Sequence, residues 1–378
     1  MTETIKTSRP IDYAKTACDT IMNKYKAPEL PTMKTFFYIG GVFLSGMQRV
    51  YFQTGEKKYF DYIKEWVDSY IFPDGTILGY NHPYDTDELT NVMKLVPKTF
   101  DHKQPGILLF DLYKKTKDDR YLKAIKYIYE KVPSWGRNSK GGFWHMEVTP
   151  DQMWLDSLYM ICPFLAMYSE FFGEKQPLDE AINQAFVMYE NMRDDRGLLH
   201  HGWDESGKAE WARENGLSPT VWGRAFGWFT VAVLDILDYV KEDTPEYKRL
   251  CKIEEEMLKK VLEYRNSSGL WCQVLDRPDD DGNWCETSCS CLFTYSLFKA
   301  IRKGVLSESY LADAKKAYSA IIDGLKFEDG QMLIENISVG TCIDEGDYKH
   351  YIERRTVTND LHGTGAFVLM CTEAEKLL

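Results

Sequence analysis

The chain has 378 residues, of which 44% are hydrophobic and 14% aromatic, so it can bury a large core. Its formal net charge of −12 argues against general binding to nucleic acids or membrane surfaces, although it does not exclude a small anionic ligand. The first ten residues are polar, and no window approaches the ~20 apolar residues of a membrane span. We therefore expect a cytoplasmic protein, monomeric or weakly dimeric, with no nucleic-acid or membrane partner. Nine dispersed cysteines, an odd number, suit a reducing compartment.

In chain order, the apolar periodicity predicts twelve helices. One-sided helices with a wet face alternate with helices that are apolar nearly all round, and helices of the second kind are buried in proteins of this composition. No linker or low-complexity run interrupts the alternation, so residues 1–378 are expected to form one domain. The predicted helices are 11–25, 36–53, 57–71, 106–117, 119–132, 154–172, 178–194, 222–240, 246–265, 286–303, 308–324 and 360–378.

Six helical hairpins in which the buried helix always comes second predict an all-α fold, a closed (α/α)6 toroid. An open solenoid is the alternative. The solenoid is disfavoured because the hairpins share no readable repeat motif, and because histidines and tryptophans concentrate where the buried helices begin. In a closed ring those starts converge on one central pocket.

Five long polar loops lead into the buried helices, whereas the connections that leave the same helices are short. Such an asymmetry predicts a rigid scaffold with one functional face, since binding residues are disproportionately loop residues on a fixed frame. The five loops are 72–104, 133–153, 195–221, 266–285 and 326–358.

Candidate functional residues gather at this end of the predicted toroid. They include the carboxylates of Asp101 and Asp156, together with Trp144, His201 and His362. Tryptophans suit a pocket that stacks the flat faces of sugar rings, and paired carboxylates suit general acid and base catalysis on a glycoside.

Simpler structural roles compete with each of these assignments. Asp101 and Asp156 lie at or near the starts of helices, where Asp is favoured as a cap or as a partner of the helix dipole. Trp222 and Trp228 could be plain core residues. Arg224 is the most suggestive charge, because burying a guanidinium without an anion is costly.

Metal ligation is not predicted. His200 and His201 are adjacent, so their side chains point apart, and no spaced partner motif accompanies them. Cys285, Cys289 and Cys291 fit small packing residues on a buried helix better than a zinc site. We expect neither a metal nor another cofactor.

Several motifs resemble, in order and over nearly the whole chain, those of glycoside hydrolase family 105, which contains unsaturated rhamnogalacturonyl hydrolases. The resemblance implies an (α/α)6 barrel that removes a 4,5-unsaturated uronic acid from the non-reducing end of oligosaccharides released by a polysaccharide lyase. The motifs are FDHKQPGILLFDLY at 100–113, QMWLDSLYMICPFLAMY at 152–168, LLHHGWD at 198–204, PTVWGRAFGW at 219–228, ETSCS at 286–290, and 338–367.

By this resemblance Asp156 is the general acid/base and Asp101 is the second aspartate of the pocket. The positions that match substrate-binding residues are His201, Trp222, Arg224 and Trp228, and we add Trp144 and His362 from their places in the loops. Protonation of C4 would develop oxocarbenium character at C5, and the same carboxylate would deprotonate the water that attacks C5. Burial beside another carboxylate should raise the pKa of such an acid.

Three other functions stay open. An unsaturated glucuronyl hydrolase would perform the same chemistry on glycosaminoglycan- or ulvan-type fragments. An (α/α)6 sugar epimerase would use two histidines as proton carriers, for which His201 and His362 are available. A sugar-binding toroid without activity would carry the aromatic residues but no carboxylate directed into the pocket.

Overall fold

The computed structural model describes residues 8–32, 34–78 and 98–378, and the described chain is mainly helical. The outer helices are α2 (Pro10–Lys24), α4 (Lys57–Asp68), α7 (Asp119–Glu130), α9 (Lys175–Asn191), α11 (Pro245–Glu263) and α13 (Leu311–Asp323). The inner helices are α3 (Tyr38–Thr54), α6 (Ile107–Thr116), α8 (Asp156–Phe172), α10 (Gly223–Ile236), α12 (Thr287–Arg302) and α15 (Leu361–Ala374). All twelve predicted helices are therefore present, with ends shifted by a few residues.

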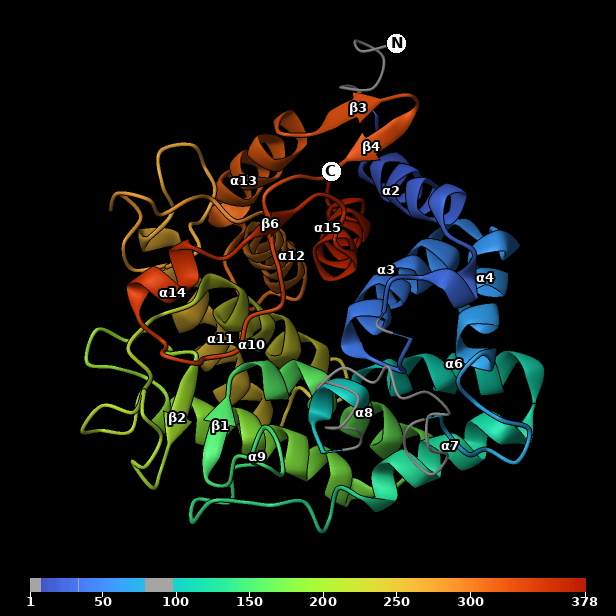
Figure 1. Ribbon diagram of the computed structural model, residues 1–378, viewed down its shortest axis with the longest axis horizontal. Helices are drawn as coiled ribbons and strands as arrows, with labels where there is room; N and C mark the ends of the chain where they lie inside the picture. Colours follow the sequence, from blue (N-terminus) through green and yellow to red (C-terminus); the bar gives the residue numbers. More distant parts are fainter. Residues whose placement is uncertain (1–7, 33, 79–97) are drawn as a thin grey trace.

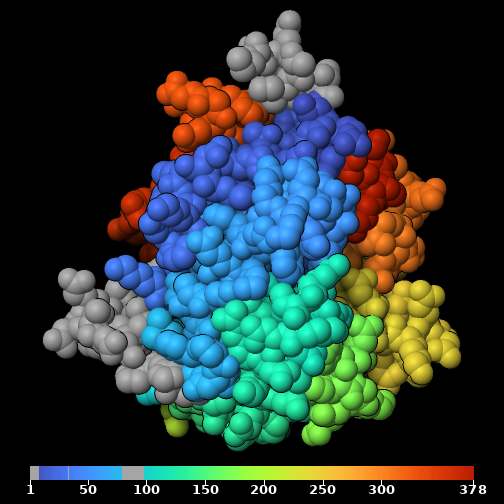
Figure 2. Space-filling model, turned by 90° about the vertical axis from the view of Figure 1, so that its right-hand side faces the viewer, coloured from blue at the N-terminus to red at the C-terminus, as the bar shows by residue number. Residues whose placement is uncertain are grey.

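The inner helices close into a ring. Each contacts the next in chain order, and α15 returns to pack against α3. In Figure 1 the colours run around the molecule from blue α2 through green α8 and α9 to red α15. At the closure α15 also packs on α2, and the Ile11 N–H donates a hydrogen bond of 3.0 Å to Glu375 Oε2. Figure 2 shows the corresponding red and blue surfaces side by side. The fold is the predicted (α/α)6 toroid.

Burial follows the predicted alternation of inner and outer helices. Every residue of α10 is buried, whereas α11 buries a single stripe of six residues. At the ring closure, the backbones of α15 and α3 approach closely. A Cβ on Gly365 would lie 2.7 Å from the backbone N of Phe43, so only glycine fits there without a shift.

Local signals set the helix ends. Thr244 precedes Pro245, the first residue of α11, and its hydroxyl accepts a hydrogen bond of 3.2 Å from the Tyr247 N–H. Gly173 ends α8 with φ of 70°, a left-handed conformation that favours glycine. A short turn can then lead directly to α9.

The long loops contain short strands and helices that the periodicity analysis did not predict. Strands of two or three residues are too short to show alternation. The antiparallel pairs are β1 (Gln152–Trp154) with β2 (Gly202–Asp204), β3 (Lys326–Glu328) with β4 (Gln331–Leu333), and β5 (Ile337–Ser338) with β6 (Thr356–Val357). The short helices of these loops are α14 (Tyr348–Ile352) and the 3-10 turns η2 (Phe100–His102) and η3 (Gln104–Gly106). Two further 3-10 turns lie outside the long loops: η1 (Ala27–Glu29) between α2 and α3, and η4 (Glu308–Tyr310) directly before α13.

These loops meet one another at the start of the inner helices. The pair β1–β2 joins the second loop to the third. Thr220 Oγ1 of the third loop donates a hydrogen bond of 2.6 Å to the carbonyl of Gly346 in the fifth. Trp284 Nε1 of the fourth loop donates a hydrogen bond of 3.0 Å to the carbonyl of Ile352, also in the fifth loop. Residues 79–97 of the first predicted loop lie outside the described residues. The other four form the single face that the sequence predicts.

No helix within the described ranges has both the length and the apolar character needed to cross a membrane.

Candidate active site

Two aspartates stand at the starts of neighbouring inner helices. Asp156 is the first residue of α8 and follows β1 directly, while Asp101 lies in η2, just before α6. Their side chains are 14% and 20% exposed. Burial and the nearby charge of Asp156 raise the pKa of Asp101 to about 8. Asp101 is therefore mainly protonated at neutral pH.

His201 holds Asp156 in the opposite state. Its Nε2 lies 3.2 Å from Asp156 Oδ2, and its Nδ1 lies 2.7 Å from the hydroxyl of Tyr351. Burial acts to raise the pKa of Asp156, but His201, with smaller contributions from His145 and Arg224, brings the pKa below its usual value. The expected rise in pKa thus falls on Asp101 rather than on Asp156. His201 lies 3.2 Å from Asp156, whereas the histidine beside Asp101, His145, is farther away at 3.9 Å and is kept neutral by burial.

His145 lies beside Asp101 and contacts Ser157, the residue that follows Asp156. Its Nε2 is 3.9 Å from Asp101 Oδ1, its Nδ1 is 2.7 Å from the hydroxyl of Ser157, and its ring stacks on Trp154 at 4.4 Å. Burial lowers the pKa of His145 to about 4, so the ring is neutral at physiological pH. The sequence predicts no role for His145, because it does not show which side chains a loop histidine contacts.

Aromatic and cationic groups continue the site from His201. The ring of Trp222 lies 4.6 Å from that of His201, and the guanidinium of Arg224 lies 4.5 Å from the Trp222 ring centre. Trp222 Nε1 donates a hydrogen bond of 3.1 Å to Gln273 Oε1. The structure thus brings together four predicted residues: Asp156, His201, Trp222 and Arg224.

Arg224 is 1% exposed, and the protein itself supplies its counter-charge. The guanidinium donates to the carbonyls of Ser338 and Val339 at 2.7 and 2.8 Å, and it lies 3.9 Å from the fully buried carboxylate of Glu286. This ion pair attaches β5 to α10 and α12. The buried guanidinium of Arg224 requires an anion, and Glu286 of the protein supplies it.

His362 stands at the start of α15 with both ring nitrogens near acceptors. Nδ1 lies 2.7 Å from Asp360 Oδ1, and Nε2 lies 3.0 Å from the carbonyl of Ser338. Nearby Tyr38 has a pKa raised by burial, and its hydroxyl is within range of the charges of Arg224 and both aspartates. Tyr38 was missed because it begins an apolar helix and resembles a core residue.

Trp228 and Trp144 lie elsewhere. Trp228 is buried deeper in the ring and stacks on Tyr159 at 4.5 Å. Trp144 packs beside Gly136, and its carbonyl accepts from Trp135 Nε1. Within the described ranges neither has a ring contact with His201 or Trp222, so their substrate-binding roles stay predictions.

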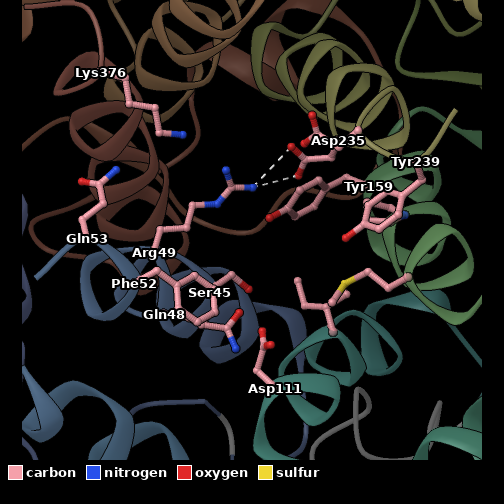
Figure 3. A pocket seen from close by; sticks show the side chains of 14 residues that line it. Ser45, Gln48, Arg49, Phe52, Gln53, Asp111, Tyr159, Asp235, Tyr239 and Lys376 are labelled. Atoms are coloured by element: carbon pink, nitrogen blue, oxygen red, sulfur yellow. Dashed lines mark hydrogen bonds and ion pairs between the residues drawn. The ribbon is translucent and has the colours of Figure 1, made fainter. Parts of the chain in front are cut away.

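A cavity of about 350 Å³ opens near the opposite ends of the inner helices (Figure 3). Arg49 and Asp235 cross it with an ion pair of 3.2 Å, and Asp111 and Tyr159 also line it. It contains none of the predicted site residues. Tyr159 both lines this cavity and stacks on Trp228.

The described ranges contain no group of three His, Cys, Asp or Glu side chains placed to hold a metal ion. The geometry instead offers a protonated carboxyl, an ionised carboxylate paired with histidine, and flanking aromatic rings. Such a set can donate a proton at one point of a bound molecule and accept one at another.

The sequence model of Glycosyl Hydrolase Family 88 matches residues 13–378. The chain therefore belongs to this family of glycoside hydrolases. A solved glycoside hydrolase from family 105 of C. acetobutylicum ATCC 824 is 32% identical, with a TM-score of 0.89 over 97% of this chain and 99% of that one. The family resemblance read from the motifs is confirmed.

Other relatives extend the comparison. The unsaturated rhamnogalacturonyl hydrolase YesR of Bacillus subtilis (strain 168) is 26% identical over 80% of this chain and 79% of its own length. An unsaturated glucuronyl hydrolase specific for heparin has a TM-score of 0.70 over 97% of this chain, at 14% identity. The second similarity concerns the fold alone.

Proposed function

We propose that the protein removes a 4,5-unsaturated uronic acid from the non-reducing end of lyase-generated oligosaccharides by hydrating the C4=C5 double bond. Unsaturated galacturonyl-rhamnose is the proposed substrate. The observation that carries this proposal is the pair of partly buried aspartates at the starts of neighbouring inner helices, of which Asp156 is paired with His201 at 3.2 Å and has a lowered pKa while Asp101 has a raised one. Hydration needs one group that gives a proton and one that takes a proton.

The reaction starts with a proton delivered to C4, which develops positive charge at C5. Water then attacks C5 as a carboxylate removes its proton, and the resulting hemiketal opens and expels the remaining sugar. Asp156 is the proposed acid/base. Because Asp156 is ionised and Asp101 carries the proton at neutral pH, Asp101 supplies the proton that Asp156 passes to C4, and Asp156 then accepts the proton of the attacking water. No covalent intermediate with the enzyme is required.

The flanking residues orient the sugar. His201 fixes the Asp156 carboxylate, and the Trp222 ring beside it offers a flat apolar face for stacking. Because Arg224 is already paired with Glu286, its proposed part is to hold β5 in place and to contribute a positive field, felt by Asp156, that favours a uronate.

The rhamnogalacturonan assignment is favoured over glycosaminoglycan fragments by the WGRAFGW and NDLHGTGAF motifs and by similarity to YesR. An epimerase that uses His362 as a proton carrier fits less well, since both nitrogens of His362 face protein acceptors.

The test is an assay on lyase-generated oligosaccharides from rhamnogalacturonan, ulvan and glycosaminoglycans, following loss of ultraviolet absorbance by the conjugated double bond. We expect the highest kcat/KM on unsaturated galacturonyl-rhamnose. Preference for a glucuronyl substrate would move the assignment to the alternative, and absence of turnover on all of them would reject it.

A further inference from the structure

Two thiols outside the candidate active site face each other across a two-stranded ribbon. Cys272 and Cys285 are partners in an isolated antiparallel bridge, and their Sγ atoms are 4.0 Å apart. The residues on either side of the pair form backbone hydrogen bonds of 2.9 Å, so the cysteines occupy a non-hydrogen-bonded position. Such pairs have Cα atoms about 4.5 Å apart, within the range that a disulfide spans. A bond between them needs side-chain rotation but little backbone movement.

The two thiols have unequal surroundings. Cys272 is 1% exposed, whereas Cys285 is half-buried and lines a surface cavity of about 70 Å³. Asn266 Nδ2 lies 2.8 Å from Cys285 Sγ, and Ser268 Oγ lies 3.8 Å from it. The contact with Cys272 lowers the pKa of Cys285 against the effect of burial, and Ser268 and Asn266 lower it further. The same contact and burial raise the pKa of Cys272. Cys285 is thus the accessible thiolate.

We propose that Cys285 is a modification site that reacts with hydrogen peroxide or another small peroxide, and that Cys272 resolves the product to an intramolecular disulfide. The Cys285 thiolate attacks one peroxide oxygen, the O–O bond breaks, and sulfenic acid and hydroxide form; sulfur loses two electrons and the peroxide gains them. Cys272 then attacks the Cys285 sulfur, the S–O bond breaks, and water leaves with the Cys272 proton.

Other cysteines lack this arrangement. Cys289 and Cys291 are fully buried, and burial raises the pKa of both thiols. Cys342 is exposed, so it reports the general access of an oxidant to the protein. Cys285 combines two features: it lines a small cavity, and its Sγ lies 4.0 Å from the Sγ of a second, buried cysteine, Cys272.

The ribbon that carries the pair also supports the active site. Gln273, next to Cys272, accepts the hydrogen bond of Trp222 Nε1. Glu286, next to Cys285, accepts a hydrogen bond of 2.9 Å from the Ser338 N–H and forms an ion pair with Arg224. A disulfide would fix this ribbon by closing a loop of the unfolded chain, so we expect the oxidised protein to unfold at a higher temperature.

The experiment oxidises the full-length native protein with hydrogen peroxide, blocks remaining thiols with iodoacetamide, and maps the cysteines by mass spectrometry. We expect a cross-linked peptide pair joining Cys272 to Cys285. It should form on the order of tenfold faster than Cys342 is oxidised. In Cys272→Ser, dimedone should trap sulfenic acid at Cys285. Cys251→Ser, a matched change at a half-buried cysteine of α11, should still give the cross-link.

Oxidation of Cys342 while Cys285 remains alkylatable would overturn the proposal. So would cross-links that involve only other cysteines, or a Cys272→Ser protein without a dimedone adduct at Cys285. The wild-type mapping requires no substitution, so a variant that fails to fold leaves the test intact. None of these readouts depends on the glycosidase substrate.

Discussion

Asp101 and Asp156 occupy one buried region but have opposite pKa shifts, and this difference determines what each substitution should do. Asp156→Asn keeps the size of the side chain but can neither give nor take a proton. We expect turnover to fall by at least ~10²-fold, while folding and substrate binding stay close to wild type. Steady-state kinetics with a thermal melt as control measures this. A near-native rate would remove Asp156 from the mechanism.

The pH dependence follows from Asp101. If the reaction needs the proton on Asp101, kcat/KM should fall as the pH rises through about 8, and it should fall again at low pH when Asp156 becomes protonated. A profile of kcat/KM between about pH 3 and pH 10 tests both limbs. A flat profile across pH 8 would show that the Asp101 proton is not used.

Asp101 also affects stability, with a definite sign. Its pKa is raised on folding, so its stabilising contribution is complete below the unfolded pKa and is lost as the pH rises through about 8. Wild type should therefore be less stable at pH 9 than at pH 6, and Asp101→Asn should lose less over this range. The difference should be on the order of 1–2 kcal/mol, reduced by partial exposure of the carboxyl. Equal pH dependence of the two melts would contradict the raised pKa.

Arg224 and Glu286 form a buried pair, so the loss of one partner leaves the other charge uncompensated. Arg224→Ala should cost about 3–5 kcal/mol of unfolding free energy and lower kcat/KM, since β5 loses its attachment. The double variant Arg224→Met, Glu286→Gln should recover much of the stability. Denaturant melts compare the three proteins. An Arg224→Ala protein of unchanged stability would show that the pair is not structural.

At the scale of elements, the contact between α15 and α3 depends on Gly365. An added methyl would lie 2.7 Å from the backbone of Phe43, which cannot move like a flexible side chain. Gly365→Ala should therefore cost about 1–3 kcal/mol. Gly173→Ala, at a turn with open space around it, is a control that tests backbone strain without a clash. Denaturant melts should rank Gly365→Ala as the less stable of the two; the reverse order would contradict the close approach.

Helices were predictable because each spans several turns and repeats its apolar pattern. The strands β1, β2, β5 and β6 were not, since they have two or three residues and pair with segments far away in the sequence. Tyr351 and Glu286 could not be predicted as the partners of His201 and Arg224, because these residues lie far apart in the sequence. The raised pKa of Asp101 could not be predicted either, because it depends on burial and on Asp156. Residue types and motifs predicted a candidate site, but the charge states within it could be inferred only from the fold.

At the scale of the whole molecule, the closed ring places the candidate active site at one end and the cavity contact of Arg49 with Asp235 near the other. Asp101, His201 and the first residue of α8, Asp156, lie where the loops meet the starts of the inner helices, while the cavity near the opposite ends is crossed by the Arg49–Asp235 ion pair. Substitutions near the opposite ends should therefore act through stability rather than through the proton transfers proposed for the aspartates.

Hydration at C5 is the central claim, and the fate of solvent atoms tests it most directly. An ordinary glycosidase directs water to the anomeric carbon with two carboxylates, so solvent oxygen would appear at C1 of the released sugar. In single turnover with immediate trapping, in water labelled with deuterium and heavy oxygen, we expect deuterium at C4 and heavy oxygen at C5. A saturated uronide of the same linkage should be inert. Label confined to C1, or cleavage of the saturated compound at a comparable rate, would contradict the mechanism.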